Sequence, residues 1–334
     1  MNILITGAAG QLGRALIKEI DFYNAANMIK VAKCACGKIK CNTHGLTQLV
    51  RPIDYILTGH REMYLDEGFD GSDEAFANED RHVQALDITD ENTVNEFVFS
   101  YMPDVIVNCA AYNAVDKAEE EPEAANLLNG KAPGFLAKAA DAVGAKIVHV
   151  STDYVFGGKG DKPLTEKDEP CPQTAYGKSK LLGEQSVASA CKKHFIIRTA
   201  WLFGEGKNFV RTMINNADRQ LRVVDDQTGC PTSASELARL IVYLIFTEKY
   251  GIWHGVCEGS TTWYGFAKKI FEFLGKNADI IPIGSMEYVC AAKRPAYSVL
   301  ENARIHTETD FTMLSWEEAL KGYLDENFKS ESLQ

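Results

Sequence analysis

The sequence contains no apolar run that approaches the ~20 residues a helix needs to cross a membrane. It also lacks an excess of positive charge, because 35 lysines and arginines stand against 46 aspartates and glutamates and give a formal net charge of -11. A nucleic acid or an anionic membrane surface would favour a basic protein, so neither is expected as a partner. No basic leader precedes the first apolar residues, and we therefore expect a cytoplasmic protein.

Two further features are missing. The nine cysteines, an odd number, are scattered along 334 residues, so no disulfide framework is expected. No linker, repeat or low-complexity segment divides the chain into independent domains. The hydrophobic content of 46% is sufficient for one large or two modest domains with a sizeable core.

The start of the chain has the pattern of a strand, a glycine turn and a helix. Residues 2–6 are apolar and rich in β-formers, and residues 14–20 have helical spacing. Between them stand Gly7, Gly10 and Gly13. Such glycines let the backbone approach a dinucleotide pyrophosphate at a helix N-terminus. The G-x-x-G-x-x-G spacing is typical of the short-chain dehydrogenase version of the dinucleotide fold, and a simple tight turn is the alternative.

Strands and helices alternate as far as residue 200. Apolar runs at 54–58, 83–86, 105–108, 147–150 and 195–199 are separated by helical segments at 91–100, 119–143 and 176–191. The alternation predicts an α/β fold, a Rossmann-type doubly wound parallel sheet with its active site at the carboxyl ends of the strands. We expect a dinucleotide-binding domain at 1–200, to which a helix at 234–248 returns, and a smaller substrate-binding lobe mostly at 201–330.

One stretch, at about 21–52, interrupts this alternation. It has no clear periodicity, although a short connection would suffice there, so it is interpreted as an insertion. It holds four potential soft-metal ligands, Cys34, Cys36, Cys41 and His44. The C-x-C spacing is tighter than that of the usual zinc pair and no second cluster supports it, so we expect reduced thiols in a small hairpin or flap and no metal.

Residues at the strand ends complete the expected cofactor site. Arg61 follows the second strand, where an acid would favour NAD and an arginine tolerates the extra phosphate of NADP, unless it is an ordinary surface charge. We therefore favour NADPH, with NADH possible. Asp87 ends the next strand, where it can meet the adenine amino group. The residues expected to bind the cofactor are Gly7, Gly10, Gln11, Leu12, Gly13, Arg61, Asp87, Ile88, Cys109, Ala110, Ala111, Tyr176 and Lys180.

Tyr176 and Lys180 stand one helical turn apart on one face of an expected helix. A close ammonium in a partly dry cleft favours the phenolate, and bringing a tyrosine from a pKa of ~10 to about 7 takes roughly 4 kcal/mol. The pair therefore predicts a general acid, although many surface helices contain the same spacing by chance. Thr152 follows an apolar run and can add a hydroxyl that holds a substrate oxygen.

Seven short motifs follow one another along nearly the whole chain. They are the glycine turn at 7–13, NCAAYNAVDKAEE at 108–120, STDYVFG at 151–157, YGKSK at 176–180, RTAWLF at 198–203, DQTGCPT at 226–232 and RPAYSVL at 294–300. On these motifs the chain resembles the extended short-chain dehydrogenase/reductases, and within them the dTDP-4-dehydrorhamnose reductase family. The resemblance implies that a nicotinamide cofactor reduces the 4-keto group of dTDP-4-dehydro-L-rhamnose, the last step in making dTDP-L-rhamnose for cell-surface polysaccharide.

The resemblance also implies roles for individual residues. Tyr176 would donate the proton, Lys180 would hold the nicotinamide ribose and lower the pKa of the tyrosine, and Thr152 would stabilise the developing oxyanion. The residues implied to contact substrate are Thr152, Asp153, Tyr154, Trp201 and Arg294. Arg294 is expected on the diphosphate, because an acidic protein that binds an anionic nucleotide-sugar must gather positive charge locally.

Some family members dimerise around magnesium through an acid two residues after the last glycine, but Ala15 stands there. We therefore expect no such metal, and a monomer or weak homodimer. Three alternatives stay open. A binding homologue like the β subunit of methionine adenosyltransferase is disfavoured by the intact catalytic residues. A dehydratase or epimerase is disfavoured because Asp153 is followed by Tyr154 and not by glutamate. The third alternative is a reductase of another dTDP-4-keto-6-deoxy sugar.

Overall fold

The centre of the protein is a mostly parallel sheet. The structure, a computed structural model, describes residues 1–35, 52–61, 63–64 and 82–328. Within these residues eight strands lie in the order β12-β7-β6-β5-β1-β2-β4-β3. Their bounds are β1 Asn2–Thr6, β2 Asp54–Gly59, β3 Met63–Tyr64, β4 His82–Ala85, β5 Val105–Asn108, β6 Lys146–Thr152, β7 His194–Thr199 and β12 Gly251–His254. All neighbours pair in parallel except β3 and β4, which confirms the predicted doubly wound α/β fold.

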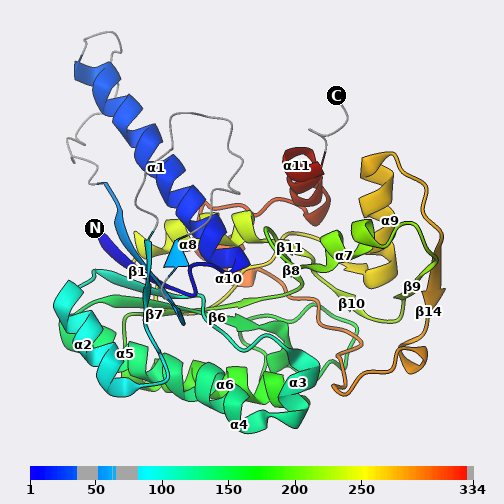
Figure 1. Ribbon diagram of the computed structural model, residues 1–334, viewed down its shortest axis with the longest axis horizontal. Coiled ribbons are helices and arrows are strands. Elements are labelled where there is room, and N and C mark those ends of the chain that lie inside the picture. The colour runs from blue at the N-terminus through cyan, green and yellow to red at the C-terminus, as the bar shows by residue number, and fades with distance from the viewer. Residues whose placement is uncertain (36–51, 62, 65–81, 329–334) are drawn as a thin grey trace.

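Helices cover both faces of this sheet (Figure 1). One face carries α1 Gln11–Ala35 and α8 Ala234–Ile245, and the other carries α2 Glu91–Tyr101, α5 Ala132–Val143 and α6 Ala175–Ala190. Side chains alternate along a strand, so Ile3 and Ile5 of β1 enter the core beneath α1 and α8, while Leu4 enters the core above α2, α5 and α6. Burial on both faces explains why the strands read as continuous apolar runs.

The remaining elements form a lobe beyond the carboxyl ends of the strands, at the right of Figure 1. Its helices are α7 Phe209–Asn215, α9 Trp263–Leu274 and α11 Trp316–Phe328. Three two-stranded ribbons pair β8 Leu202–Phe203 with β11 Thr232–Ser233, β9 Leu221–Val224 with β14 Ile280–Ile283, and β10 Thr228–Gly229 with β13 Thr261–Thr262. The lobe has an aromatic core of its own, in which Phe203, Phe266 and Trp316 pack together.

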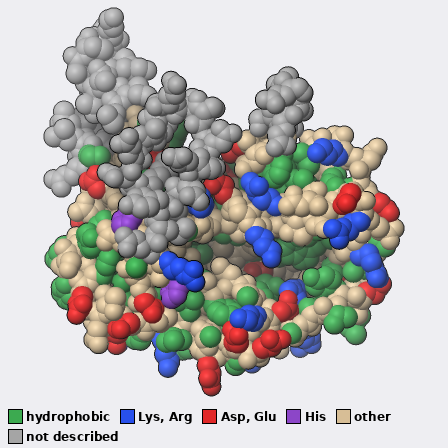
Figure 2. All heavy atoms as spheres, in the orientation of Figure 1, with side chains coloured by type: hydrophobic (Ala, Val, Ile, Leu, Met, Phe, Trp, Pro, Cys, Tyr) green, Lys and Arg blue, Asp and Glu red, His purple; other side chains and the backbone are tan. Residues whose placement is uncertain are grey.

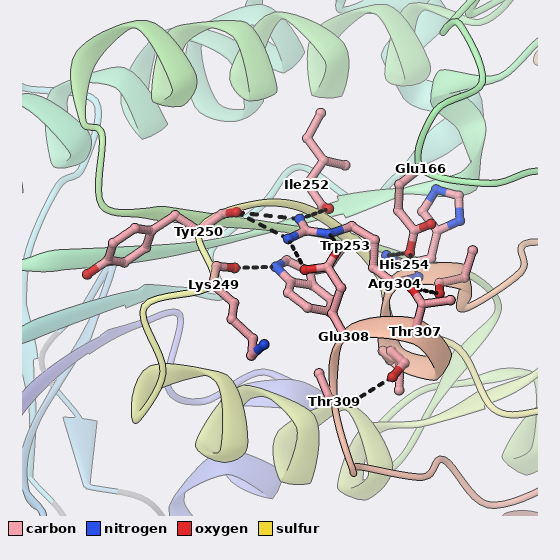
Figure 3. A network of polar contacts seen from close by, with 12 residues as sticks. Glu166, Lys249, Tyr250, Ile252, Trp253, His254, Arg304, Thr307, Glu308 and Thr309 are labelled. Carbon is pink, nitrogen blue, oxygen red and sulfur yellow. Dashed lines mark hydrogen bonds and ion pairs between the residues drawn. The ribbon is translucent and has the colours of Figure 1, made fainter.

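The edge strand β12 comes from the part of the chain where the lobe was expected, so the sheet does not end at residue 200. A network around Arg304 of α10, Ala303–Glu308, holds this edge (Figure 3). The guanidinium lies 3.9 Å from the ring centroid of Trp253, donates to the Ile252 carbonyl at 2.7 Å and pairs with Glu308 at 2.7 Å. Glu166 accepts the backbone N–H groups of His254 and Arg304 at 3.1 and 3.2 Å.

Two predicted elements were wrong in their extent. The first helix was expected near residues 14–20, but α1 continues to Ala35, so the first part of the supposed insertion is helical. Cys34 is in the last turn of α1, whereas Cys36, Cys41 and His44 lie outside the described residues. Within the described ranges no group of three or more His, Cys, Asp or Glu side chains is placed to hold a metal ion. No helix there is long and apolar enough to cross a membrane.

The helix predicted at 119–143 consists of four successive segments, and only Glu121, between the first two, is not helical. These are α3 Val115–Glu120, α4 Pro122–Ala125, a π-helical turn at Asn126–Lys131 and α5. Pro122 and Pro133 lack the N–H that would continue the helix, and π turns are often found at functional sites. The π turn brings Asn129 inward, where its amide exchanges hydrogen bonds with the Tyr112 backbone at 2.8 and 3.0 Å and donates to Ser179 of α6 at 3.0 Å.

Candidate active site

The turn between β1 and α1 packs against the end of β5 with no space for a side chain. Gly7 has φ of +64°, and a Cβ there would lie 2.7 Å from the backbone nitrogen of Ala110. A Cβ on Gly13 would lie 2.6 Å from the Cα of Ala8. Glycine is therefore required at both positions. Gly10 closes the turn through its N–H, which donates to the Gly7 carbonyl at 2.9 Å.

A buried polar network holds this wall in place, and the sequence reasoning missed it. The Asn108 side-chain oxygen accepts from the Thr6 hydroxyl at 2.6 Å and from the Ala110 N–H at 3.2 Å. Its amide nitrogen is 3.2 Å from Nδ1 of His149. Burial lowers the pKa of His149 well below its ordinary value, so the ring is neutral and Nδ1 can accept that hydrogen bond. The asparagine that opens the NCAA motif was the available signal.

The other expected cofactor residues line the same end of the sheet. Leu12 is a buried residue of α1. Gln11, also in α1, donates to the Lys207 carbonyl at 3.2 Å, which joins α1 to the loop before α7. Burial raises the pKa of the Cys109 thiol to about 12, so it stays protonated at neutral pH. Ala111 is half-buried in the loop that follows Ala110.

Arg61 and Asp87 are exposed near the carboxyl ends of the paired strands β2 and β4. Asp87 accepts from the hydroxyl and the backbone N–H of Thr89 at 2.6 and 2.9 Å, and these hydrogen bonds lower its pKa. The carboxylate is therefore ionised at neutral pH and able to accept further donors. Ile88 is buried in the core beside it.

Tyr176, Lys180 and Thr152 meet at the carboxyl end of β6. Thr174 caps α6 by accepting from the Gly177 N–H at 3.0 Å, which fixes the helix start one residue before Tyr176. A Cβ on Gly177 would lie 2.2 Å from the Tyr154 carbonyl, so α6 packs directly on the turn after β6. Both Tyr176 and Lys180 are buried in the structure.

The electrostatics of this pair differ from the expectation. Burial raises the pKa of Tyr176 above its ordinary value, and a hydrogen bond with Thr152 lowers it only in part. The Lys180 ammonium donates to the Val150 carbonyl at 2.8 Å, and burial lowers the pKa of this lysine to about 8. In this structure the phenol is therefore protonated at neutral pH, and the predicted pKa near 7 is not reached.

Asp153 follows Thr152 but is turned into the protein, with 1% of its surface exposed. The carboxylate accepts from the Thr152 hydroxyl at 2.9 Å, and a hydrogen bond from Ser298 also reaches it. Burial raises the pKa of Asp153 to about 6. The ring of Tyr154 meets the ring of Tyr176 edge-on at 5.5 Å between centroids.

A cavity of about 210 Å³ opens beside Tyr154. Three cationic side chains line it, from Lys159, Lys293 and Arg294. Lysine and arginine side chains also stand on both sides of the hollow at the centre of the face in Figure 2. Arg294 is already paired, because its Nη1 and Nη2 donate to the two oxygens of Asp116 at 3.1 and 2.6 Å. The sequence predicted the arginine but not this partner from α3.

Trp201 adopts the left-handed region with φ of +46°, which is uncommon for a bulky residue. Its indole stacks on Trp263 of α9 with centroids 3.5 Å apart and an angle of 6° between the planes. A Cβ on Gly229 would lie 2.5 Å from that indole. Trp201 is not among the described residues that line the 210 Å³ cavity, whereas Tyr154 and Arg294 are.

Comparison with known proteins gives a consistent picture. The family model described as "RmlD substrate binding domain" matches residues 58–328. The spore coat polysaccharide biosynthesis protein SpsK of Bacillus subtilis is 42% identical over 72% of this chain and 86% of its own length. The dTDP-4-dehydrorhamnose reductase of Escherichia coli is 38% identical over 74% of this chain and 87% of its own.

Solved structures agree over nearly the whole chain. The crystal structure of a dTDP-4-dehydrorhamnose reductase from Clostridium acetobutylicum has a TM-score of 0.79 and 40% identity, and covers 97% of this chain and 99% of that one. The enzyme from Bacillus anthracis, in complex with NADP, has a TM-score of 0.77 and 34% identity with the same coverage. On its sequence and its fold alike, this chain belongs to the dTDP-4-dehydrorhamnose reductase family.

Proposed function

We propose that this protein uses NADPH to reduce the 4-keto group of dTDP-4-dehydro-L-rhamnose, giving dTDP-L-rhamnose. The observation that carries the proposal is the geometry at the carboxyl end of β6: Tyr176 is buried, hydrogen-bonded to Thr152 and in contact with Tyr154, which lines a cavity with cationic side chains. Membership of the reductase family supplies the substrate class.

The glycine turn fits a dinucleotide. The backbone at Gly7 and Gly13 packs so closely on its neighbours that a Cβ would collide, and backbone without side chains can approach a pyrophosphate. Gly7, Gly10, Gln11, Leu12 and Gly13 would hold the pyrophosphate. Cys109, Ala110 and Ala111 would form the opposite wall, Asp87 and Ile88 would receive the adenine, and Arg61 would receive the 2′-phosphate that distinguishes NADPH. When bound, the reduced nicotinamide supplies the hydride.

Tyr176 supplies the proton. Burial keeps the phenol protonated at neutral pH, so it can donate to the carbonyl oxygen as the carbonyl carbon receives the hydride, and the keto group becomes an alcohol. Thr152 would stabilise the same oxygen by turning its hydroxyl, which donates to Asp153 in this structure, toward the substrate. Lys180 has three donors, one of which meets Val150, so it can also hold ribose hydroxyls and stabilise the phenolate left behind.

The substrate contacts follow from the walls of the site. We assign Tyr154 and Arg294 to the nucleotide-sugar through the 210 Å³ cavity, and Trp201 to a sugar face with Trp263 stacked behind it. Asp153 would act through Thr152, whose hydroxyl donates a hydrogen bond to its carboxylate. The substrate lobe then comes mostly from 201–330 and the nucleotide domain from 1–200 with α8. We further propose that the protein is cytoplasmic. We also propose a monomer or weak homodimer, because Ala15 stands at the position of the metal-binding acid.

The test is an assay of purified protein with dTDP-4-dehydro-6-deoxyhexoses and each reduced nicotinamide, followed by loss of absorbance. We expect turnover of dTDP-4-dehydro-L-rhamnose with NADPH preferred over NADH, and dTDP-L-rhamnose as the product. Faster reduction of a different 4-keto sugar would assign another substrate. Cofactor binding without turnover of any keto sugar would overturn the proposal in favour of a binding homologue.

A further inference from the structure

Residues 284–295, here called the strap, leave β14 and end at the substrate cavity. Two of the apolar side chains in the strap are almost fully exposed, Met286 at 95% and Val289 at 98%. Packing therefore contributes little to fixing its path, apart from the buried methyl group of Ala292. At its start, the Ser285 N–H donates to the Asp226 carboxylate at 2.9 and 3.0 Å. Polar contacts, among them the ion pair between Glu287 and Arg222 at 2.7 Å, therefore decide where the strap lies.

Asp116 makes the contacts at the other end, and it comes from the opposite side of the site, in α3. Its Oδ1 accepts from the Ala292 N–H at 3.0 Å and from Nη1 of Arg294 at 3.1 Å. Its Oδ2 accepts from Nη2 of Arg294 at 2.6 Å. One carboxylate thus holds both the backbone of the strap and the guanidinium that the strap carries. The hydrogen bonds from Arg294 lower the pKa of Asp116, so this carboxylate is charged at neutral pH.

The pairing leaves Arg294 able to bind a ligand. A guanidinium has five N–H donors, and the Asp116 carboxylate takes one from each terminal nitrogen, so Nε and the outer hydrogens remain. The Arg294 side chain is 20% exposed and lines the cavity together with Lys293 and Tyr154. A two-point contact fixes the plane of the guanidinium as well as its position, and a bidentate acceptor such as a diphosphate requires that orientation.

We infer that Asp116 is a positioning residue for the nucleotide-sugar: it holds the strap closed and orients Arg294 toward the substrate diphosphate. The inference rests on the proposed function for the identity of the ligand. It makes α3, which is part of the nucleotide-binding half of the chain, a determinant of substrate affinity. Asp116 and the diphosphate can bind Arg294 together, because Asp116 leaves three of the five N–H donors of Arg294 unused. The hydrogen bond from the Ala292 N–H to Asp116 holds the strap whether or not Arg294 has a ligand. Lys159 and Lys293 keep the cavity cationic.

The experiment compares Asp116→Ala, Asp116→Asn, Arg294→Ala and the double variant Asp116→Ala/Arg294→Ala with the unaltered protein. For each protein we would measure kcat and KM with dTDP-4-dehydro-L-rhamnose, KM for NADPH, and the affinity for dTDP alone by calorimetry. Glu123→Ala is the matched control, because Glu123 is an exposed carboxylate on the neighbouring α4. Thermal unfolding of every variant shows whether it is folded.

We expect Asp116→Ala to raise KM for the sugar substrate and the dissociation constant of dTDP roughly five- to twentyfold, with kcat and the NADPH KM within about threefold. The loss of affinity in Asp116→Asn should lie between zero and that of Asp116→Ala, because an amide has one acceptor oxygen where the carboxylate has two. The loss in the double variant should be clearly smaller than the sum of the two single losses, since both changes remove the contact between Asp116 and Arg294. Glu123→Ala should change none of these values.

Three outcomes would overturn the inference. They are unchanged affinities in a folded Asp116→Ala, tighter dTDP binding in that variant, which would make Asp116 a competitor, and full additivity in the double variant. If Asp116→Ala does not fold, Asp116→Asn decides on the same criteria. The dTDP titration separates this inference from the proposed function, because weaker dTDP binding in the Asp116 variants would support it even if the unaltered protein reduced no keto sugar.

Discussion

The two halves of the active site are built in different ways. The proposed nucleotide half is a wall of backbone in which Gly7 approaches Ala110, and Gly13 approaches Ala8, so closely that one added carbon would collide. The substrate half depends on side chains, with Arg294 carried on an exposed strap and oriented by one carboxylate. Backbone contacts of this kind tolerate little change and suit a constant cofactor, whereas ion pairs at a partly exposed surface can be rearranged for a different sugar.

This difference between the two halves predicts which property each substitution should change. Changes in the nucleotide half should weaken cofactor binding and lower stability together, because one packing arrangement provides both. Changes in the substrate half should alter KM for the nucleotide-sugar and leave the fold intact. Tyr176 and Thr152 lie where the halves meet, so changes there should act on the chemical step alone.

Tyr176→Phe should have the largest effect. The substitution keeps the ring in its edge-on contact with Tyr154 and removes only the hydroxyl that we propose as the proton donor. We expect kcat to fall by roughly 10² to 10⁴-fold, with NADPH affinity nearly unchanged. Steady-state kinetics and a fluorescence titration of NADPH measure the two quantities. A variant that retained near-normal kcat would remove Tyr176 from the mechanism.

Gly7→Ala should have the next largest effect and is the sharpest test of the nucleotide half. The new methyl group would lie 2.7 Å from the backbone of Ala110 at a φ of +64°. We expect a loss of roughly 2 to 4 kcal/mol in the free energy of unfolding and at least a tenfold loss of NADPH affinity. Urea unfolding and NADPH titration measure them.

Gly144→Ala is the matched control for that experiment. Gly144 also has positive φ, +74°, at the end of α5, but a Cβ there meets nothing within 4 Å. It should cost about 1 kcal/mol for the backbone conformation and leave NADPH binding unchanged. Equal effects of the two substitutions would show that the close approach to Ala110 contributes nothing, and the contrast between the halves would then fail.

The same contrast explains what the sequence could predict. The glycine turn, the strand ends and the Tyr176 and Lys180 pair are local patterns, so their positions follow from spacing. The partnership of Asp116 with Arg294 joins residues that are far apart in the chain, and no local pattern identifies it. The extent of α1 was missed because residues 21–35 lack a clear apolar period, and the break at 119–143 because an alanine-rich run concealed the effect of Pro122 and Pro133.

Arg294→Ala tests the substrate half directly. The diphosphate is bound equally in the ground and transition states, so KM for the nucleotide-sugar should rise roughly 10 to 100-fold, or about 1.5 to 3 kcal/mol, with kcat within a few-fold. Arg294→Lys should recover only part of the loss, because an ammonium cannot make the two-point contact. Unfolding free energies should change little in either variant. An unaltered KM in Arg294→Ala would place the diphosphate elsewhere.

Asp153→Asn should have the smallest effect, and it should depend on pH. Burial raises the pKa of Asp153 in the folded state to about 6, although hydrogen bonds from Ser298 and Thr152 offset part of the rise. An unfolded aspartate titrates near ~3.9, so between about pH 4 and 6 the folded protein binds more protons and loses stability as pH rises.

Asparagine carries no such proton and can still accept the Thr152 hydroxyl. Relative to the unaltered protein, Asp153→Asn should therefore be more stable at pH 7.5 than at pH 4.5, by roughly 1 to 2 kcal/mol. Urea unfolding of both proteins at the two pH values measures the difference. We expect kcat to stay within about threefold, because the carboxylate is buried and hydrogen-bonded to Thr152. A stability difference that is the same at both pH values would show that Asp153 is not a strained, buried charge. A large loss of kcat would instead place its carboxylate in the chemistry, where the two halves of the site meet.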